Sequence, residues 1–240
     1  MAKALIHAAA KYDKGSIKTT TLQYCLPSYT STIRALQYSR SGQSRQNKPT
    51  LIVTMPTTPG AGSLPGVTRE AGKIKHSLRN FSVVDTLHKP TAEDVLQALS
   101  GYTIAHFACH GVSSTNPADH LLLLKGTGDV DKLRVKDIAA LKLPAARLAY
   151  LSACNTANST TLIDEVTHIV SSFHIAGFTN ATGTLWRAED EACHKMAEDF
   201  YSTLSKTDNV AVSYRNAVLG LMKQTPLQPM YWAPFIHFGT

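Results

Sequence analysis

Two short stretches of the chain decide its fold. The first reads Tyr102-Thr103-Ile104-Ala105-His106-Phe107-Ala108-Cys109-His110-Gly111, and the second reads Leu148-Ala149-Tyr150-Leu151-Ser152-Ala153-Cys154-Asn155-Thr156. Each is an apolar run of roughly 5–8 residues, the length of a buried strand, and each stops at small and polar residues. Functional residues of an open parallel sheet gather just beyond the carboxyl ends of its strands. His110 and Cys154 fall there, and neighbouring strands lie only about 4.8 Å apart.

His110 and Cys154 together predict a Cys/His dyad that attacks a peptide carbonyl. A thiol nucleophile needs a base or a cationic neighbour, because the thiolate is the reactive form. The alternative for Cys154 is a buried thiol that packs like a small apolar residue. Spacing alone does not decide between these two roles.

Strand and helix patterns alternate from residue 50 to the end of the chain. The patterns predict strands at 50–55, 81–87, 102–110, 121–124, 148–154, 181–186 and 232–238, and helices at 67–78, 91–99, 135–141, 162–176, 189–205 and 211–223. This rhythm favours a doubly wound α/β sandwich, with a mostly parallel sheet, helices on both faces and right-handed crossovers.

The first 49 residues are less regular. A strand at 19–26 and a helix at 33–40, capped after a Pro-Ser turn, are predicted there. We expect residues 1–49 to pack on the core or lead into it, and residues 50–240 to form the main domain. The glycines of 57–66 lack the P-loop pattern, which argues against a nucleotide loop.

The composition narrows the class of protein. The net charge of +7 comes from 24 basic and 17 acidic residues, spread without a run of five basic residues. This favours a solvated surface over nucleic-acid binding, although the charge could attract an acidic protein partner. No apolar run approaches the roughly 18–20 residues that span a bilayer, and no export signal is evident, which predicts a cytoplasmic protein away from membranes. The four cysteines show no C-x-x-C pair and are expected as free thiols.

The two stretches resemble the CHAT domain, a caspase-like cysteine peptidase family related to caspases, metacaspases, separase and gingipain. The shared pattern is a strand that ends in His-Gly, here His110-Gly111, and a later strand that ends in Ala-Cys, here Ala153-Cys154. Further blocks resemble the family, most closely its fungal members, and extend the likeness over nearly the whole chain. They are residues 28–32, 55–60, 64–66, 164–168, 176–178, 183–186 and 232–235.

The resemblance implies a caspase-like three-layer sandwich and a cysteine endopeptidase. His110 would be the base and Cys154 the nucleophile that forms a thioester acyl-enzyme. The backbone N–H groups of Gly111 and Cys154 would form the oxyanion hole. Such an enzyme needs no metal or cofactor, acts on a protein or peptide, and is expected to be latent until a regulatory partner activates it. The alternative is a catalytically silent caspase-fold scaffold in a signalling pathway, and the oligomeric state stays open.

Four residues are candidates for substrate contact. Trp186, Arg187 and Asp190 follow a strand that in caspases pairs with the substrate backbone, and the alternative for Trp186 is a plug at the sheet edge. Glu165 could line a specificity pocket or orient His110, and the alternative is a solvated helix face. Metacaspases carry an acid two positions before the nucleophile, where this chain has Ser152. The preference for the substrate residue before the scissile bond (P1) therefore stays open.

Two neighbours of His110 are expected to be structural. Strand alternation turns His106 and His110 to one face and Cys109 to the other. His106 is predicted to be a hydrogen-bonded core histidine and Cys109 a packing residue. A zinc site built from His106, Cys109, His110 and Cys154 is disfavoured, because Cys109 and His110 point apart.

Overall fold

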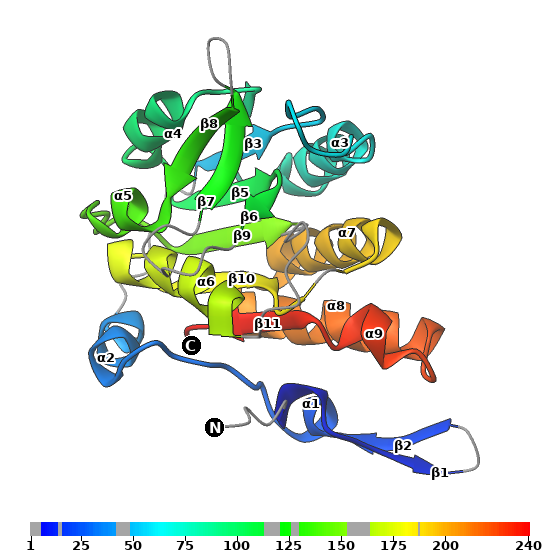
Figure 1. Cartoon of the computed structure of the whole chain (residues 1–240). Coiled ribbons are helices and arrows are strands. Elements are labelled where there is room, and N and C mark those ends of the chain that lie inside the picture. Colours follow the sequence, from blue (N-terminus) through cyan, green and yellow to red (C-terminus); the bar gives the residue numbers. More distant parts are fainter. Residues whose placement is uncertain are drawn as a thin grey trace.

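A central six-stranded sheet organises the molecule (Figure 1). A computed structural model describes residues 6–13, 16–41, 49–112, 121–125, 130–152, 164–186 and 188–240. The strand order is β11-β10-β9-β5-β3-β4, and only the β10–β11 pair is antiparallel. The strands are β3 (Thr50–Thr54), β4 (Val84–His88), β5 (Ile104–Ala108), β9 (Leu148–Ser152), β10 (Asn180–Thr184) and β11 (Phe235–Phe238). The predicted mostly parallel sheet is confirmed.

Helices cover both faces of this sheet, which makes three layers (Figure 1). One face carries α4 (Ala92–Leu99), α5 (Val135–Ala139) and α6 (Asp164–Ala176). The other carries α3 (Val67–Leu78), α7 (Asp190–Thr207) and α8 (Val210–Gln224). The predicted α/β sandwich is confirmed. No helix in the described ranges has both the length and the apolarity needed to cross a bilayer.

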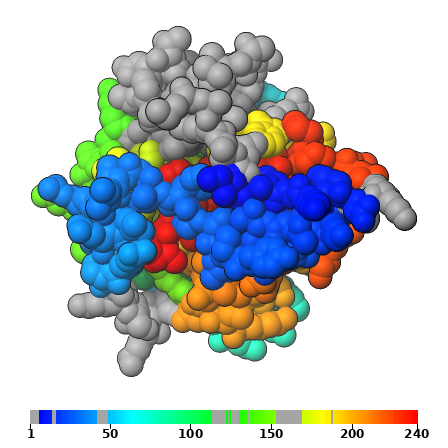
Figure 2. Space-filling model, turned by 90° about the horizontal axis from the view of Figure 1, so that it is seen from below, coloured from blue at the N-terminus to red at the C-terminus, as the bar shows by residue number. Residues whose placement is uncertain are grey.

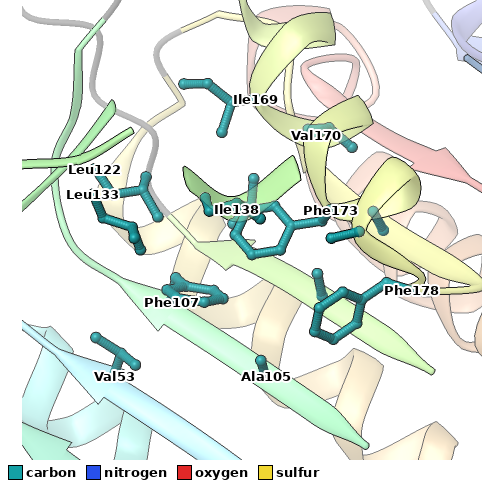
Figure 3. Packing of buried hydrophobic residues seen from close by; sticks show 14 of the residues in the cluster. Val53, Ala105, Phe107, Leu122, Leu133, Ile138, Ile169, Val170, Phe173 and Phe178 are labelled. Carbon is teal, nitrogen blue, oxygen red and sulfur yellow. The ribbon is translucent and has the colours of Figure 1, made fainter. Parts of the chain in front are cut away.

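The two faces follow from strand alternation. Phe107 belongs to the core under α4, α5 and α6, where its ring centroid lies 5.0 Å from that of Phe173 (Figure 3). His106, one residue earlier, turns to the opposite layer and stacks on Tyr150 at 5.0 Å. Successive side chains of a strand point to opposite faces, so a strand covered on both sides must be apolar nearly throughout.

A second, antiparallel sheet covers the side that carries α4 and α5. It consists of β6 (Gly111–Val112), β7 (Leu121–Lys125) and β8 (Val130–Arg134). Leu122 and Leu133 enter the core near Phe107 (Figure 3). The Asp131 carboxylate accepts a hydrogen bond of 2.6 Å from the N–H of Ala92 at the start of α4. The sequence predicted an edge strand or a hairpin at 121–124 with its turn at 126–128, and the antiparallel pairing of β7 with β8 matches the hairpin; the turn residues lie outside the described part of the chain.

The N-terminal segment stretches across one face of the molecule (Figure 2). It contains a 3-10 turn (Ile6–Ala8), β1 (Ala10–Asp13), β2 (Ser16–Thr20), α1 (Thr21–Tyr24) and α2 (Ile33–Arg40). The helix at 33–40 is confirmed, and Thr32 caps it by accepting from the N–H of Ala35. The strand at 19–26 is wrong beyond Thr20, because Gln23 caps a helical turn there and Leu22 is buried in the core.

Two predicted strands begin later than expected. The N–H groups of Phe81 and Ser82 bond back to the carbonyl of Leu78, so they continue the end of α3 rather than start β4. A short helix, α9 (Pro229–Trp232), precedes β11 and takes the first residue of the predicted strand 232–238. The N-terminal segment joins this edge of the sheet, since Tyr29 N–H donates to the carbonyl of His237. The domain boundary at residues 49 and 50 stays a prediction.

Gly177, which follows α6, has a backbone conformation that residues with a side chain rarely adopt. Its φ is +118°, and an added Cβ would lie 2.6 Å from the Leu143 carbonyl oxygen. We expect Gly177→Ala to lower the free energy of unfolding by about 2–3 kcal/mol, measured by urea denaturation. Gly72→Ala is the matched control. Its Cβ would meet nothing within 4 Å inside α3, so this change should stabilise by about 0.5–1 kcal/mol. Equal effects of the two changes would contradict the backbone argument.

Candidate active site

His110 and Cys154 follow neighbouring strands. β5 and β9 pair in parallel, and Ala108 lies opposite Ser152 at their carboxyl ends. His110 comes two residues after Ala108, and Cys154 comes two residues after Ser152 in the sequence. The structure therefore brings the ends of the two predicted strands together. Cys154 itself lies outside the described residues.

The imidazole of His110 is buried, with 3% of its surface exposed. Its Nε2 lies 2.7 Å from the carbonyl oxygen of Gly62, in the loop that joins β3 to α3. A carbonyl oxygen only accepts hydrogen bonds, so Nε2 carries the proton and donates it. In the neutral ring Nδ1 is then the unprotonated nitrogen. Nδ1 is buried and has no hydrogen-bond partner within the described part of the chain.

The loop that holds His110 is itself fixed to the sheet. Met55 N–H donates to the carbonyl of Ala108 at 2.9 Å, and Leu64 N–H donates to the carbonyl of Pro56 at 2.8 Å. Leu64 and Val67 pack on Ala108, two residues before His110. The loop thus positions the Gly62 carbonyl against Nε2 and leaves Nδ1 as an oriented proton acceptor.

Other buried polar atoms at this end of the sheet also lack partners among the described residues. They are Thr184 Oγ1, in the last residue of the neighbouring strand β10, and Trp186 Nε1, two residues later. Buried polar groups are hydrogen-bonded in most proteins, and exceptions often mark ligand or catalytic sites. This end of the sheet therefore has the unfilled hydrogen-bonding capacity expected of a site.

A buried carboxylate lies below this end of the sheet, on the face to which His106 points. Glu70 of α3 is 4% exposed. Its Oε2 lies 3.1 Å from Nδ1 of His194 in α7. Its Oε1 lies 3.0 Å from Nε2 of His106, an ion-pair distance at which the atoms are not aligned as a hydrogen bond. His106 Nδ1 lies 3.1 Å from the hydroxyl of Tyr201.

The surroundings of Glu70 keep it ionised. Burial raises the pKa of Glu70, but its interactions with His106, His194 and Ser152 outweigh burial and lower the pKa to about 2. The hydrogen bond between Glu70 and His194 also raises the pKa of His194. The Glu70 carboxylate therefore lies beside Ser152. Position 152 itself, two residues before Cys154, carries a serine and no acid.

The sequence interpretation missed Glu70 and the role of His194. The available signal was the position of Glu70 on the apolar stripe of α3, three residues after Val67 and four before Ile74. Acids on such a stripe are rarely buried without a partner. The partners are residues from β5 and α7, distant in the sequence, so their identity needed the tertiary structure.

The remaining predicted site residues are dispersed. Gly111 begins β6 and pairs with Leu122 of β7. Trp186 is half-buried and packs against both cores, and Asp190 is exposed at the start of α7. Arg187 and the side chain of Glu165 lie outside the described residues. The substrate-contact roles of these residues stay predictions.

His106 and Cys109 lie on opposite faces of β5. His106 is fully buried in the cluster around Glu70, and Cys109 is buried in the core under α4, α5 and α6. Within the described ranges, no group of three or more His, Cys, Asp and Glu side chains is placed to hold a metal ion.

Comparisons with known proteins agree on the fold. A model of the CHAT domain family matches residues 5–240. The structure is similar to a chain of the complex of Porphyromonas gingivalis RgpB pro- and mature domains, with a TM-score of 0.56, 11% identity, and 86% of this chain and 51% of that chain covered. It is also similar to the Arg-specific cysteine proteinase gingipain R, with a TM-score of 0.55, 10% identity, and 86% and 50% covered.

A third similar structure is a chain of the Saccharomyces cerevisiae separase–securin complex. The TM-score is 0.53 at 17% identity, and the match covers 86% of this chain but 13% of the yeast chain. The chain thus spans about half the length of the gingipain chains and a smaller part of the yeast chain. At these identities the likeness shows the fold alone. A search of curated proteins found no match.

Proposed function

The chain belongs to the CHAT family and has a caspase-like fold, and from this premise we propose that it is a cysteine-type endopeptidase with a His110/Cys154 dyad. The observation that carries the proposal is the hydrogen bond from His110 Nε2–H to the Gly62 carbonyl. It leaves the unprotonated Nδ1 at the end of β5, where β9 leads to Cys154 along the neighbouring strand.

In this mechanism His110 moves the protons. Nδ1 takes the proton of the Cys154 thiol, and the thiolate attacks the scissile carbonyl carbon. The Gly62 carbonyl stabilises the resulting imidazolium through the Nε2–H bond and holds the ring in place. When the C–N bond breaks, the proton on Nδ1 passes to the leaving amine, and a thioester remains on Cys154.

The second half of the reaction releases the acyl group. A water molecule gives a proton to Nδ1 as it attacks the thioester, and the thiol regains that proton when the C–S bond breaks. The backbone N–H groups of Gly111 and Cys154 are proposed to bind the oxyanion in both steps. Removal of one such donor typically costs about 10²–10³ in rate.

The substrate is proposed to be a protein or peptide, and the resting enzyme is proposed to be latent. The burial of His110 under the loop from β3 to α3 supports latency, because a base with 3% exposure offers little access to a substrate. A regulatory partner that moves this loop would then activate the enzyme. The alternative function is a scaffold that keeps the fold without turnover.

Active-site labelling tests the dyad. Purified protein is treated with acyloxymethyl-ketone peptides of varied P1 residue and analysed by intact mass. We expect one adduct on the wild type and none on Cys154→Ala. We expect His110→Ala to label about 10²–10⁴ times more slowly, the usual contribution of a general base.

Cys25→Ala is the matched control, because Cys25 is an exposed free thiol. Its removal should leave the labelling rate unchanged. An adduct that disappears with Cys25 but persists in Cys154→Ala would refute the dyad. A wild type that stays unlabelled is the result expected both of a latent enzyme without its partner and of a scaffold, and labelling that appears only when a binding partner is added would identify the latent enzyme.

A further inference from the structure

A groove of about 600 Å³ lies far from His110, between α2 and the end of α6. One wall is α2, with Ala35 and Tyr38. The other wall is Leu143 and Pro144, which precede β9, with Ile175 and Gly177 at the end of α6. The residues of this second wall lead into the amino ends of β9 and β10, whereas His110 follows the carboxyl end of β5. The groove and the candidate active site are therefore at opposite edges of the sheet.

The walls are held in place by hydrogen bonds. His174 of α6 lies 2.7 Å from Ser39 Oγ and 3.4 Å from Ser31 Oγ, so it ties both ends of α2 to the core. Leu143 N–H donates to the carbonyl of Ala176 at 2.9 Å, which fixes the opposite wall. A pre-formed groove binds without a large ordering cost.

Exposed apolar side chains lie both in the groove and next to it. Ile175 is 59% exposed, and Ile33, at the first position of α2, is 76% exposed. Exposed apolar side chains that adjoin an apolar groove are typical of a protein-binding surface rather than of a small-molecule pocket. Helical segments bind such grooves through apolar residues at i, i+3 or i+4, and i+7.

The charged residues that line the groove are both basic. Arg34 and Lys142 line it, both are exposed, and neither has an ion-pair partner among the described residues. None of the residues that line it is acidic. The whole chain is basic, with a net charge of +7. A partner with acidic side chains beside its apolar residues complements this surface.

We propose that this groove is a docking site for an acidic, amphipathic segment of a partner protein. The apolar side of the segment occupies the space between Tyr38 and Ile175, and its carboxylates pair with Arg34 and Lys142. A segment bound there leaves the opposite edge of the sheet open to a substrate. The inference goes beyond the proposed function and does not depend on catalysis by Cys154.

A displayed library of 16-residue peptides tests the proposal. The library is first passed over the Ile175→Asp variant, and the peptides that bind this variant are discarded. The remaining peptides are then selected for binding to the wild-type chain. We expect enriched peptides to combine apolar residues at helical spacing with an excess of Asp and Glu. A synthetic copy should bind the double variant Arg34→Glu, Lys142→Glu roughly tenfold more weakly, and added salt should weaken binding to the wild type.

Val83→Asp is the control, because Val83 is 67% exposed and does not line the groove. It should bind the synthetic peptide as the wild type does, and thermal unfolding should show that all variants are folded. The proposal is overturned if nothing is enriched over Ile175→Asp, if the enriched peptides lack the acidic excess, or if charge reversal leaves affinity unchanged.

Discussion

His106→Leu is expected to lower the free energy of unfolding by about 3–5 kcal/mol at pH 7. The substitution leaves Glu70 buried and deprives it of the contact from His106 Nε2 at 3.0 Å. Removing one partner of a buried charge is costly because the charge is then compensated by fewer contacts, here those from His194 and Ser152. Leucine keeps an apolar side chain next to Tyr150, so the loss of the charge partner should outweigh the change in packing.

The pH dependence identifies the cause of that loss. The pKa of Glu70 is lowered in the folded protein from its ordinary value of 4.5 to about 2, which corresponds to roughly 3 kcal/mol. A lowered carboxyl pKa contributes stability above the unfolded pKa, and this stability is lost as pH falls through the folded pKa. In His106→Leu burial is opposed by fewer partners, so the pKa of Glu70 rises. The difference between wild type and variant should therefore be largest at pH 7, begin to fall below about pH 4.5 and vanish only near pH 2, so that at pH 3.5 it is reduced but still present.

Urea unfolding at pH 7, 5 and 3.5, followed by tryptophan fluorescence, measures this difference. His76→Leu is the matched control, because His76 is an exposed histidine of α3 that contacts Arg79. It should change the free energy of unfolding by less than about 0.5 kcal/mol. A loss for His106→Leu that is the same at pH 7 and pH 3.5 would assign the effect to packing instead of charge.

Sequence patterns predicted the helices and strands whose formation depends on neighbouring residues in the chain. β3, β5 and β9 are apolar runs that end at small or polar residues, and both faces of these strands are covered. α4 begins after Thr91, whose hydroxyl accepts from the N–H of Asp94, the capping contact that the residue types suggested. The parallel pairing of β5 with β9 then aligns the ends of the strands that lead to His110 and Cys154.

Features that depend on contacts between residues far apart in the sequence could not be predicted in the same way. The tautomer of His110 depends on the Gly62 carbonyl, a backbone atom 48 positions away that no residue type reveals. Glu70 depends on His106 and His194, from two other elements. Leu22, in a segment predicted as a strand, takes a helical turn because its burial in the core overrides local preference.

The second large effect concerns the core between α6 and the sheet. Phe173 of α6 is fully buried, and its ring lies 5.0 Å from Phe107 and 5.7 Å from Phe178 between centroids (Figure 3). Phe173→Ala is expected to cost about 3–5 kcal/mol, from lost burial of the ring and from the cavity left behind. Chemical denaturation at pH 7 measures this cost.

Ile175→Ala, two residues along the same helix, is the control. Ile175 is 59% exposed, so its truncation should change stability by less than about 0.5 kcal/mol. A loss below 1 kcal/mol for Phe173→Ala would mean that Phe107 and Phe178 collapse into the space. A domain is stabilised by only about 5–15 kcal/mol in total. A loss of about 3–5 kcal/mol from Phe173→Ala would therefore remove a large part of the stability of the domain. Phe173 lies in α6, the helix that follows Cys154 in the sequence.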